Sequence, residues 1–224
     1  MGEMKRTNGP FQFYTRLNLS ELTGLKASNI PELLEIVETV PGACIYHHTH
    51  RFLQQHQYLS PEPPNDFAYW VAESIGDDEL GEKLASIDTI QFGTIRDLRN
   101  KIVATIAGHL AGSPSAKRRF AREGDEFHFI KSMSFVLPTG YVAHSLKDFA
   151  EILKKVTIDS IYFHMFEARL RLERGTNDFS VWIENSLGET ELARVIARLD
   201  PYTQTLDDLR RGLIQLVERR AAAR

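Results

Sequence analysis

Hydrophobic and polar residues alternate at two places in the chain, about half a chain length apart. The alternating apolar residues are Phe11, Phe13, Leu17 and Leu19 in the first place and Phe127, Phe129, Met133 and Phe135 in the second. A period of two residues is typical of a β-strand that buries one face. Turn residues follow each strand, at Thr23-Gly24 and Pro138-Thr139-Gly140. We therefore expect each strand to enter a short hairpin or a hooked ribbon.

After each strand the apolar spacing changes to three and four residues, which predicts helices. Capping residues mark several starts, because Ser, Thr and Asn side chains accept hydrogen bonds from the first free N–H groups of a helix. The expected caps are Asn29, Asn65 and Thr94 in the first half and Ser145, Asn177 and Thr205 in the second. A second helix is expected to carry the Ile-Tyr-x-His segment to about residue 58 or 173, and a short fourth helix to follow Gly76 or Gly188. Each half thus predicts a strand and about five helices.

The two halves resemble each other in sequence. Residues 11–48 align with 127–164, residues 65–88 with 177–200, and residues 94–106 with 205–217, with identical residues at 25 of 75 aligned positions. We interpret this as a tandem duplication with a first repeat at 11–110, a linker at 111–126 and a second repeat at 127–220. The predicted fold is mainly α (α+β), with the repeats packed in pseudo-two-fold symmetry because one repeat alone buries little core.

The predicted linker contains Gly112-Ser113-Pro114-Ser115 and the basic run Lys117-Arg118-Arg119. A solvated linker is the simpler interpretation, and a local site for an anionic partner is the alternative.

The composition is that of an ordinary globular protein, with 224 residues, 42% hydrophobic, 25% charged and a formal net charge of −3. This charge gives no overall attraction to nucleic acid or to an anionic membrane, so we expect neither partner. The sequence contains no membrane-spanning run and no secretory signal. A single cysteine, Cys44, favours a reducing, cytoplasmic location. At the start of a helix its thiol pKa would be lowered, but Ser160 replaces it in the second repeat.

One histidine is duplicated together with an aspartate. His48 and His164 lie on the apolar stripe of the predicted second helix, and Asp66 and Asp178 follow the cap of the third helix. A buried histidine needs a hydrogen-bond partner, so we expect His48 to pair with Asp66 and His164 with Asp178 as structural pairs. The alternative is a catalytic acid–base pair of His48 and Asp66. Trp70 and Trp182 are expected to be core anchors.

The other first-repeat histidines have no counterpart in the second repeat. His47 and His50 are three residues apart, and His56 follows closely. A His-x-x-His pair on a helix can bind a divalent transition metal if a third ligand joins, and His56, Glu62 and Glu73 are nearest in sequence. The alternative is an exposed polar or interface cluster, and no other cofactor is predicted.

Two segments carry a resemblance to a known family. Residues 45–52, with the sequence IYHHTHRF, and residues 60–71, with the sequence SPEPPNDFAYWV, resemble the signature of an uncharacterised bacterial domain-of-unknown-function family. The resemblance covers nearly the whole chain and implies no reaction. The proline-rich loop in the second segment lies near the histidines and can line a pocket or dock a partner. Candidate contact residues are His47, His50, His56, Arg51, Glu62 and Tyr69.

These observations favour a non-enzymatic binding or regulatory module that uses protein contacts or a ligand in the cleft between repeats, and that can form homo-oligomers. The alternative is a histidine-centred, metal-assisted enzyme with its site on the first repeat. Nucleic-acid binding has only the short basic runs in its favour.

Overall fold

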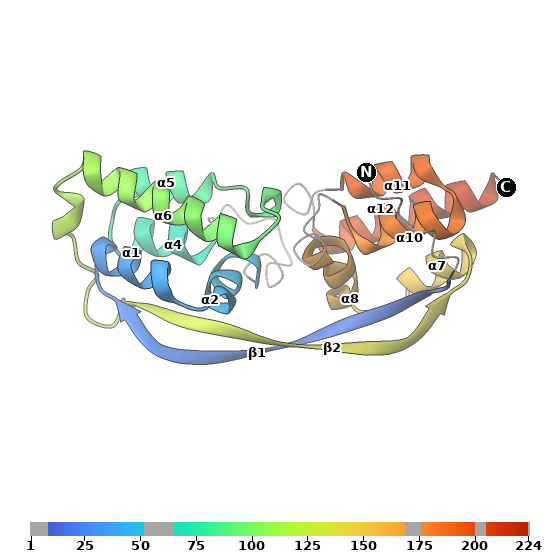
Figure 1. The fold of residues 1–224 in the computed structure, drawn as a ribbon, viewed down its shortest axis with the longest axis horizontal. Coiled ribbons are helices and arrows are strands. Elements are labelled where there is room, and N and C mark those ends of the chain that lie inside the picture. Colours follow the sequence, from blue (N-terminus) through green and yellow to red (C-terminus); the bar gives the residue numbers. More distant parts are fainter. Residues whose placement is uncertain (1–8, 52–64, 169–175, 200–204, 224) are drawn as a thin grey trace. The chain divides into compact units, whose positions relative to one another are not determined.

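The computed structural model describes residues 9–51, 65–168, 176–199 and 205–223. The protein belongs to the α+β class, with helices and one two-stranded sheet (Figure 1). The first half contains β1 (Phe11–Ala27), α1 (Ile30–Thr39), α2 (Gly42–Tyr46), the π-helical turn η1 (His47–Arg51), α4 (Asp66–Glu73), α5 (Asp78–Ala85), the 3₁₀ turn η2 (Thr89–Gln91), α6 (Ile95–Gly112) and the 3₁₀ turn η3 (Ala116–Arg118). The second half contains β2 (Phe127–Ala143), α7 (Leu146–Leu153), α8 (Ile158–Tyr162), the π-helical turn η4 (Phe163–Glu167), α10 (Asp178–Leu187), α11 (Thr190–Ala197) and α12 (Leu206–Ala222). Among the residues described, no helix has the length and apolar character needed to span a membrane.

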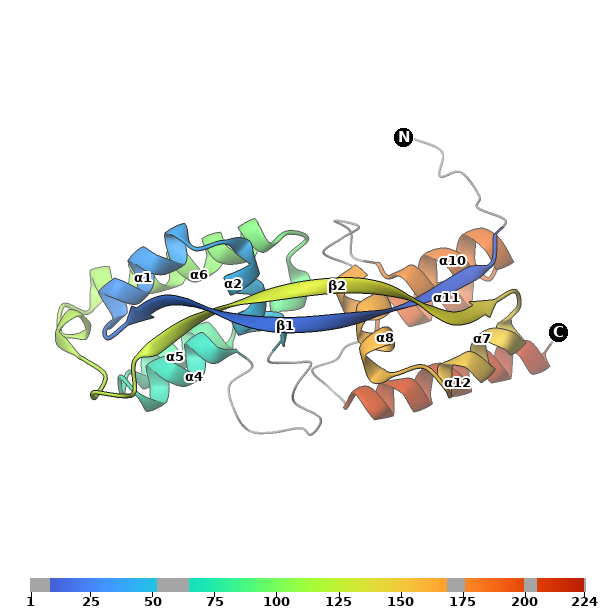
Figure 2. The same cartoon turned by 90° about the horizontal axis from the view of Figure 1, so that it is seen from below.

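The two strands pair with each other along their length (Figure 2). Side-chain contacts fix the register, since Asn18 meets Ser134, Glu21 meets Lys131, and Lys26 meets Glu126. The partner's number falls as the residue number rises, so the strands are antiparallel.

The hairpin expected within each repeat does not form, because Thr23-Gly24 and Thr139-Gly140 lie inside the long strands. The Thr23 hydroxyl donates to the Phe129 carbonyl at 2.7 Å and accepts from the Leu25 N–H at 3.1 Å. Gly24 has φ of 79°, which is typical of a local strand irregularity such as a bulge. The turn-forming residues thus distort a continuous strand and do not reverse it.

The chain divides into two compact units, each of which we describe separately. The N-unit comprises residues 18–51 and 65–134, and the C-unit comprises residues 9–17, 135–168, 176–199 and 205–223. The unit boundaries fall inside both strands, between Leu17 and Asn18 in β1 and between Ser134 and Phe135 in β2. The units therefore differ from the predicted ranges 11–110 and 127–220, because each strand begins in the unit that holds the helices of the other half of the chain.

The N-unit core takes its aromatic strand residues from β2. Phe127 and Phe129 are buried among the helices α1 to α6, and the Phe127 ring lies 5.1 Å from that of Phe67 and 5.7 Å from that of Trp70. The Trp70 indole N–H donates to the Asp125 carbonyl at 2.7 Å. This bond fastens the chain just before β2 to α4.

The C-unit core takes its aromatic strand residues from β1 in the same way. Phe11 and Phe13 are buried with the residues of α7 to α12, and the Phe11 ring lies 5.5 Å from that of Trp182. The Trp182 indole N–H donates to the Gly9 carbonyl at 3.0 Å. Both tryptophans are 6% exposed and lie in the cores, as the sequence predicts.

The apolar residues in the middle of each strand are not buried with the phenylalanines. Leu17, Leu19, Met133 and Phe135 are 41–52% exposed, so the single buried face predicted from the alternation is wrong beyond the first two positions. The reason is that each strand leaves one helical unit at this point and enters the next.

Six helices begin at the N-cap residues that the sequence predicts. Asn29, Asn65 and Thr94 each accept a backbone hydrogen bond at the start of α1, α4 and α6. Ser145, Asn177 and Thr205 do the same for α7, α10 and α12. The helix starts predicted from these residues are confirmed.

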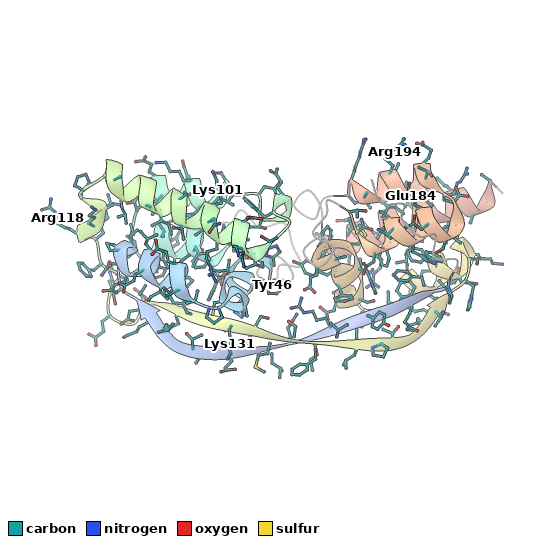
Figure 3. The ribbon with its side chains drawn as sticks, in the orientation of Figure 1. Tyr46, Lys101, Arg118, Lys131, Glu184 and Arg194 are labelled. Carbon is teal, nitrogen blue, oxygen red and sulfur yellow. The ribbon has the colours of Figure 1, made fainter. Side chains whose placement is uncertain are left out.

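The segment predicted as a solvated linker is partly packed. Ala116 in η3 is fully buried, and the Ala121 N–H donates to the Ser28 carbonyl at 2.8 Å. The basic side chains remain exposed, and Figure 3 shows Arg118 projecting away from the helices of the N-unit. The backbone is thus anchored, and of the three basic residues Arg119 also contacts the N-unit through the Gly76 carbonyl and the Asp77 carboxylate.

Candidate functional site

His48 connects the first residue of α4 to the edge of β2 inside the N-unit. Its Nδ1 lies 2.7 Å from Oδ2 of Asp66, and its Nε2 accepts the Ile130 N–H at 3.0 Å. Because Nε2 is an acceptor, the ring proton sits on Nδ1 and is donated to the carboxylate. The ring is 2% exposed, and both nitrogens are engaged. In this state the imidazole offers neither a proton nor a lone pair to a substrate.

The C-unit contains the matching arrangement. Nδ1 of His164 lies 2.8 Å from Oδ2 of Asp178, and Nε2 accepts the Tyr14 N–H at 2.8 Å. The Ser160 hydroxyl donates to the Tyr14 carbonyl at 2.6 Å, so α8 and η4 together cover this edge of β1. Covering a strand edge prevents unwanted pairing with other strands.

His47 and His50 lie in the π-helical turn η1, not in the regular helix that the sequence predicts. The His50 ring is 2% exposed and stacks on Tyr46, labelled in Figure 3, with centroids 5.3 Å apart and 9° between planes. Its Nδ1 lies 2.9 Å from the Thr49 hydroxyl. The His47 ring is half-buried and packs edge-on against His48. A π-turn rotates less per residue than an α-helix, so the facing expected for an i, i+3 pair does not apply.

The structure describes only some of the remaining candidate contact residues. His56 and Glu62 lie outside the described residues, and so does the proline-rich loop. Arg51 ends η1, and Tyr69 is 47% exposed on α4. Within the described ranges, no group of three His, Cys, Asp or Glu residues could hold a metal ion.

A charged cluster around the buried Asp77, which the sequence patterns did not indicate, lies elsewhere in the N-unit. Asp77 caps α5 and accepts a hydrogen bond from His109 at 3.0 Å, and Arg119 approaches the same carboxylate oxygen at 3.5 Å. Burial alone would raise the pKa of Asp77, but the bonds from His109 and the Leu80 N–H, with the charges of His109 and Arg119, lower it overall. In the C-unit the aligned Glu189 pairs with Arg220 at 2.5 Å. The sequence signal for this cluster is that Asp77 and Glu189 align with each other and each directly precedes a predicted helix.

Cys44 is buried in the N-unit core. Burial raises the pKa of its thiol, and the nearby charges of Lys131 and Arg99 only partly oppose this. The lowered pKa expected at a helix start is therefore wrong, because desolvation outweighs the effect of the five-residue helix α2.

The most exposed apolar surface of the C-unit lies on its two strands. We call it the ribbon patch, and its members are Tyr14, Leu17, Phe135, Val136, Leu137, Tyr141 and Val142, each 37–52% exposed. Phe135, Val136 and Leu137 are consecutive, so apolar side chains project from both faces of β2 here. The alternating pattern predicts that Leu17 and Phe135 lie on a buried face, so it does not indicate this surface.

Comparison with known proteins places this geometry in a family. Residues 8–218 match a family of unknown function, DUF5752. The chain belongs to this family. The DUF5752 assignment agrees with the predicted resemblance to an uncharacterised family. A solved structure, described as the structure of OrfY from Thermoproteus tenax, is similar with a TM-score of 0.79 and 30% identity, over 96% of this chain and 97% of that one. No functionally curated protein matches.

Proposed function

We propose that the protein is a non-enzymatic protein-binding module and that the ribbon patch is its binding surface. The observation that carries the proposal is the run Phe135-Val136-Leu137, with three consecutive apolar side chains 45–50% exposed. A strand that only covers a core exposes one face, whereas this one exposes apolar groups on both. Clustered exposed apolar residues on a folded protein often mark interaction sites.

The edge chemistry of β2 supports a protein partner. Pro138 follows the apolar run and lacks an N–H, which limits uncontrolled extension of the sheet along this edge. Gln12, on the paired strand β1, donates its side-chain amide to the Thr139 and Tyr141 carbonyls at 2.7 and 3.2 Å, so these two acceptors are satisfied on the side of β2 that faces β1. A partner therefore gains mainly apolar contact along residues 135–137.

Photo-cross-linking tests the proposal. A photoreactive residue at Val136 in the native host should give a discrete cross-linked protein that mass spectrometry identifies. The partner is expected to contact both faces of β2, so the double variant Phe135→Ser, Leu137→Ser, whose side chains lie on the face opposite Val136, should lose this product. A photoreactive residue at Val195, which is 47% exposed on α11 of the same unit, is the matched control. Equal labelling from positions 136 and 195 would contradict the proposal.

We further propose that the chain is a tandem duplication whose strands are exchanged between repeats. The matched His–Asp pairs, the matched tryptophan bonds and the aligned π-turns η1 and η4 support it. A cytoplasmic location is part of the same proposal, and the buried free thiol of Cys44 is consistent with it.

A further inference from the structure

A groove of about 460 Å³ lies on the N-unit between α1 and α6, away from its strands. Its apolar lining residues are Pro31, Leu34, Ala107, Leu110 and Ala111. The α1 residues are three apart and the α6 residues are three and four apart, so each helix contributes one stripe to the groove. Grooves formed by two packed helices are suited to receive a third helix.

The charged residues of the groove are unevenly placed. Glu35 and Glu38 are exposed on the α1 wall, and Lys117 of η3 also lines the groove. Among the described residues, no ion pair engages either glutamate. The α1 wall therefore presents two carboxylates beside an apolar floor.

Glu38 also lies in an unfavourable position on its own helix. The last turn of α1 carries no basic residue, and Glu38 precedes its final residue. Carboxylates near a helix C-terminus are repelled by the negative end of the helix dipole. A cation supplied by a partner would relieve this repulsion.

The C-unit has a cation at the position that aligns with Glu38 of the groove. There Lys154 replaces Glu38, and its ammonium lies 2.8 Å from Glu151 on α7 and 2.8 Å from Glu218 on α12. These contacts raise the pKa of Lys154 to about 12. Glu151 aligns with Glu35, and Glu218 aligns with Ala107 of the groove. In the C-unit a lysine of the chain itself thus joins the two helices, and the N-unit has a carboxylate in its place.

We propose that the α1–α6 groove binds an amphipathic helix of another protein, with apolar residues facing Leu34 and Leu110 and a lysine or arginine facing Glu35 and Glu38. The partner's ammonium or guanidinium occupies the role that Lys154 has in the C-unit. This site is independent of the ribbon patch, because all its residues lie on α1, α6 and η3.

Selection from a displayed library of helical peptides tests the site. Peptides that bind the wild-type protein are selected without counter-selection, and their affinities for the wild type and for Glu38→Lys are then measured by fluorescence anisotropy. Enriched peptides should combine apolar residues with Lys or Arg on one helix face. Their affinity should fall at least tenfold with Glu38→Lys and should fall as salt rises.

The variants separate binding from folding. Glu38→Lys places a cation at the end of α1 and should leave the melting temperature unchanged or higher. Glu82→Lys, the same charge reversal on an exposed residue of α5, is the matched control and should keep wild-type affinity. The ribbon double variant should also retain peptide binding, which distinguishes this site from the proposed function.

Three results would overturn the inference. The first is a selection that yields no binders or yields acidic or purely apolar ones. The second is equal loss of affinity with Glu82→Lys. The third is a change of oligomeric state with Glu38→Lys in sedimentation, because the groove would then be occupied by a second copy of the chain.

Discussion

Nε2 of His164 accepts a hydrogen bond from the backbone N–H of Tyr14, a residue 150 positions earlier in the chain. The same ring binds Asp178, so one side chain joins a strand edge, a π-turn and a helix start within the C-unit. Such a buried junction is expected to matter for stability more than for chemistry.

Replacing His164 by Gln should lower the free energy of unfolding by about 2 kcal/mol or more, because the buried Tyr14 N–H and the Asp178 carboxylate lose well-placed partners. Urea titration followed by tryptophan fluorescence measures this. His128→Gln changes an exposed histidine of β2 and should be nearly neutral. An unchanged urea midpoint for His164→Gln would contradict a structural role for the His164–Asp178 pair.

The strand exchange predicts where core mutations act. Phe13→Ala should cost about 3–5 kcal/mol through loss of a fully buried aromatic side chain. Hydrogen exchange should speed up in α7 and α10 of the C-unit, although residue 13 lies far from these helices in the sequence. The reciprocal variant Phe129→Ala should loosen α1 and α4 instead. Faster exchange in α1 and α4 with Phe13→Ala would show that the strand packs within its own repeat.

Asp77 predicts a specific acid dependence of stability. Its folded-state pKa lies below the ordinary value of 3.8, so the unfolded state takes up its proton first as the pH falls. The stabilisation is complete above the unfolded pKa and is lost as the pH falls through the folded pKa. Asp77→Asn should therefore lower the melting temperature at pH 7 and flatten its fall below about pH 4.

Melting curves between pH 7 and pH 2.5 provide the measurement for Asp77. Glu82→Gln, an exposed acid on the same helix, should retain the wild-type profile. Parallel curves for Asp77→Asn and the wild type would show that the acid dependence arises elsewhere.

The Cys44 thiol should be unreactive in the folded protein, because burial both blocks access and raises its pKa. Iodoacetamide at pH 8 should modify it more than 100-fold more slowly than in guanidinium chloride, by mass spectrometry. Rapid labelling of the native protein would indicate that α2 opens readily.

Local chemistry could be predicted from the sequence, and long-range pairing could not. Asn29, Thr94 and Thr205 cap helices as expected, because a cap depends on residues three positions away. Whether Thr23-Gly24 forms a turn or stays in a strand depends on pairing with β2, more than 100 residues later. Residues that are typical of a turn therefore lie inside β1.

The candidate site shows the same division between local and distant effects. The proximity of His48 to Asp66 is suggested by their duplication, but the bond from Ile130 to Nε2 requires knowledge of which strand enters the unit. The π-turn η1 rearranges His47 and His50, and no periodicity in a five-residue stretch distinguishes it from an α-turn. The ribbon patch could not be predicted, because alternation indicates a strand but does not indicate which part of that strand the helices cover.

The exchanged strands also constrain how the gene can be divided. A polypeptide ending in the segment between α6 and β2 would carry α1 to α6 without Phe127 and Phe129, and the complementary fragment would lack Phe11 and Phe13. Each fragment would lack the two strand phenylalanines of its core and keep only the helix aromatics, such as Phe67 in one and Phe179 in the other, so the two are expected to fold fully only when mixed. If the proposed duplication holds, a single-copy chain with this strand exchange would be an intertwined dimer, and joining two copies replaces a concentration-dependent assembly by an intramolecular one.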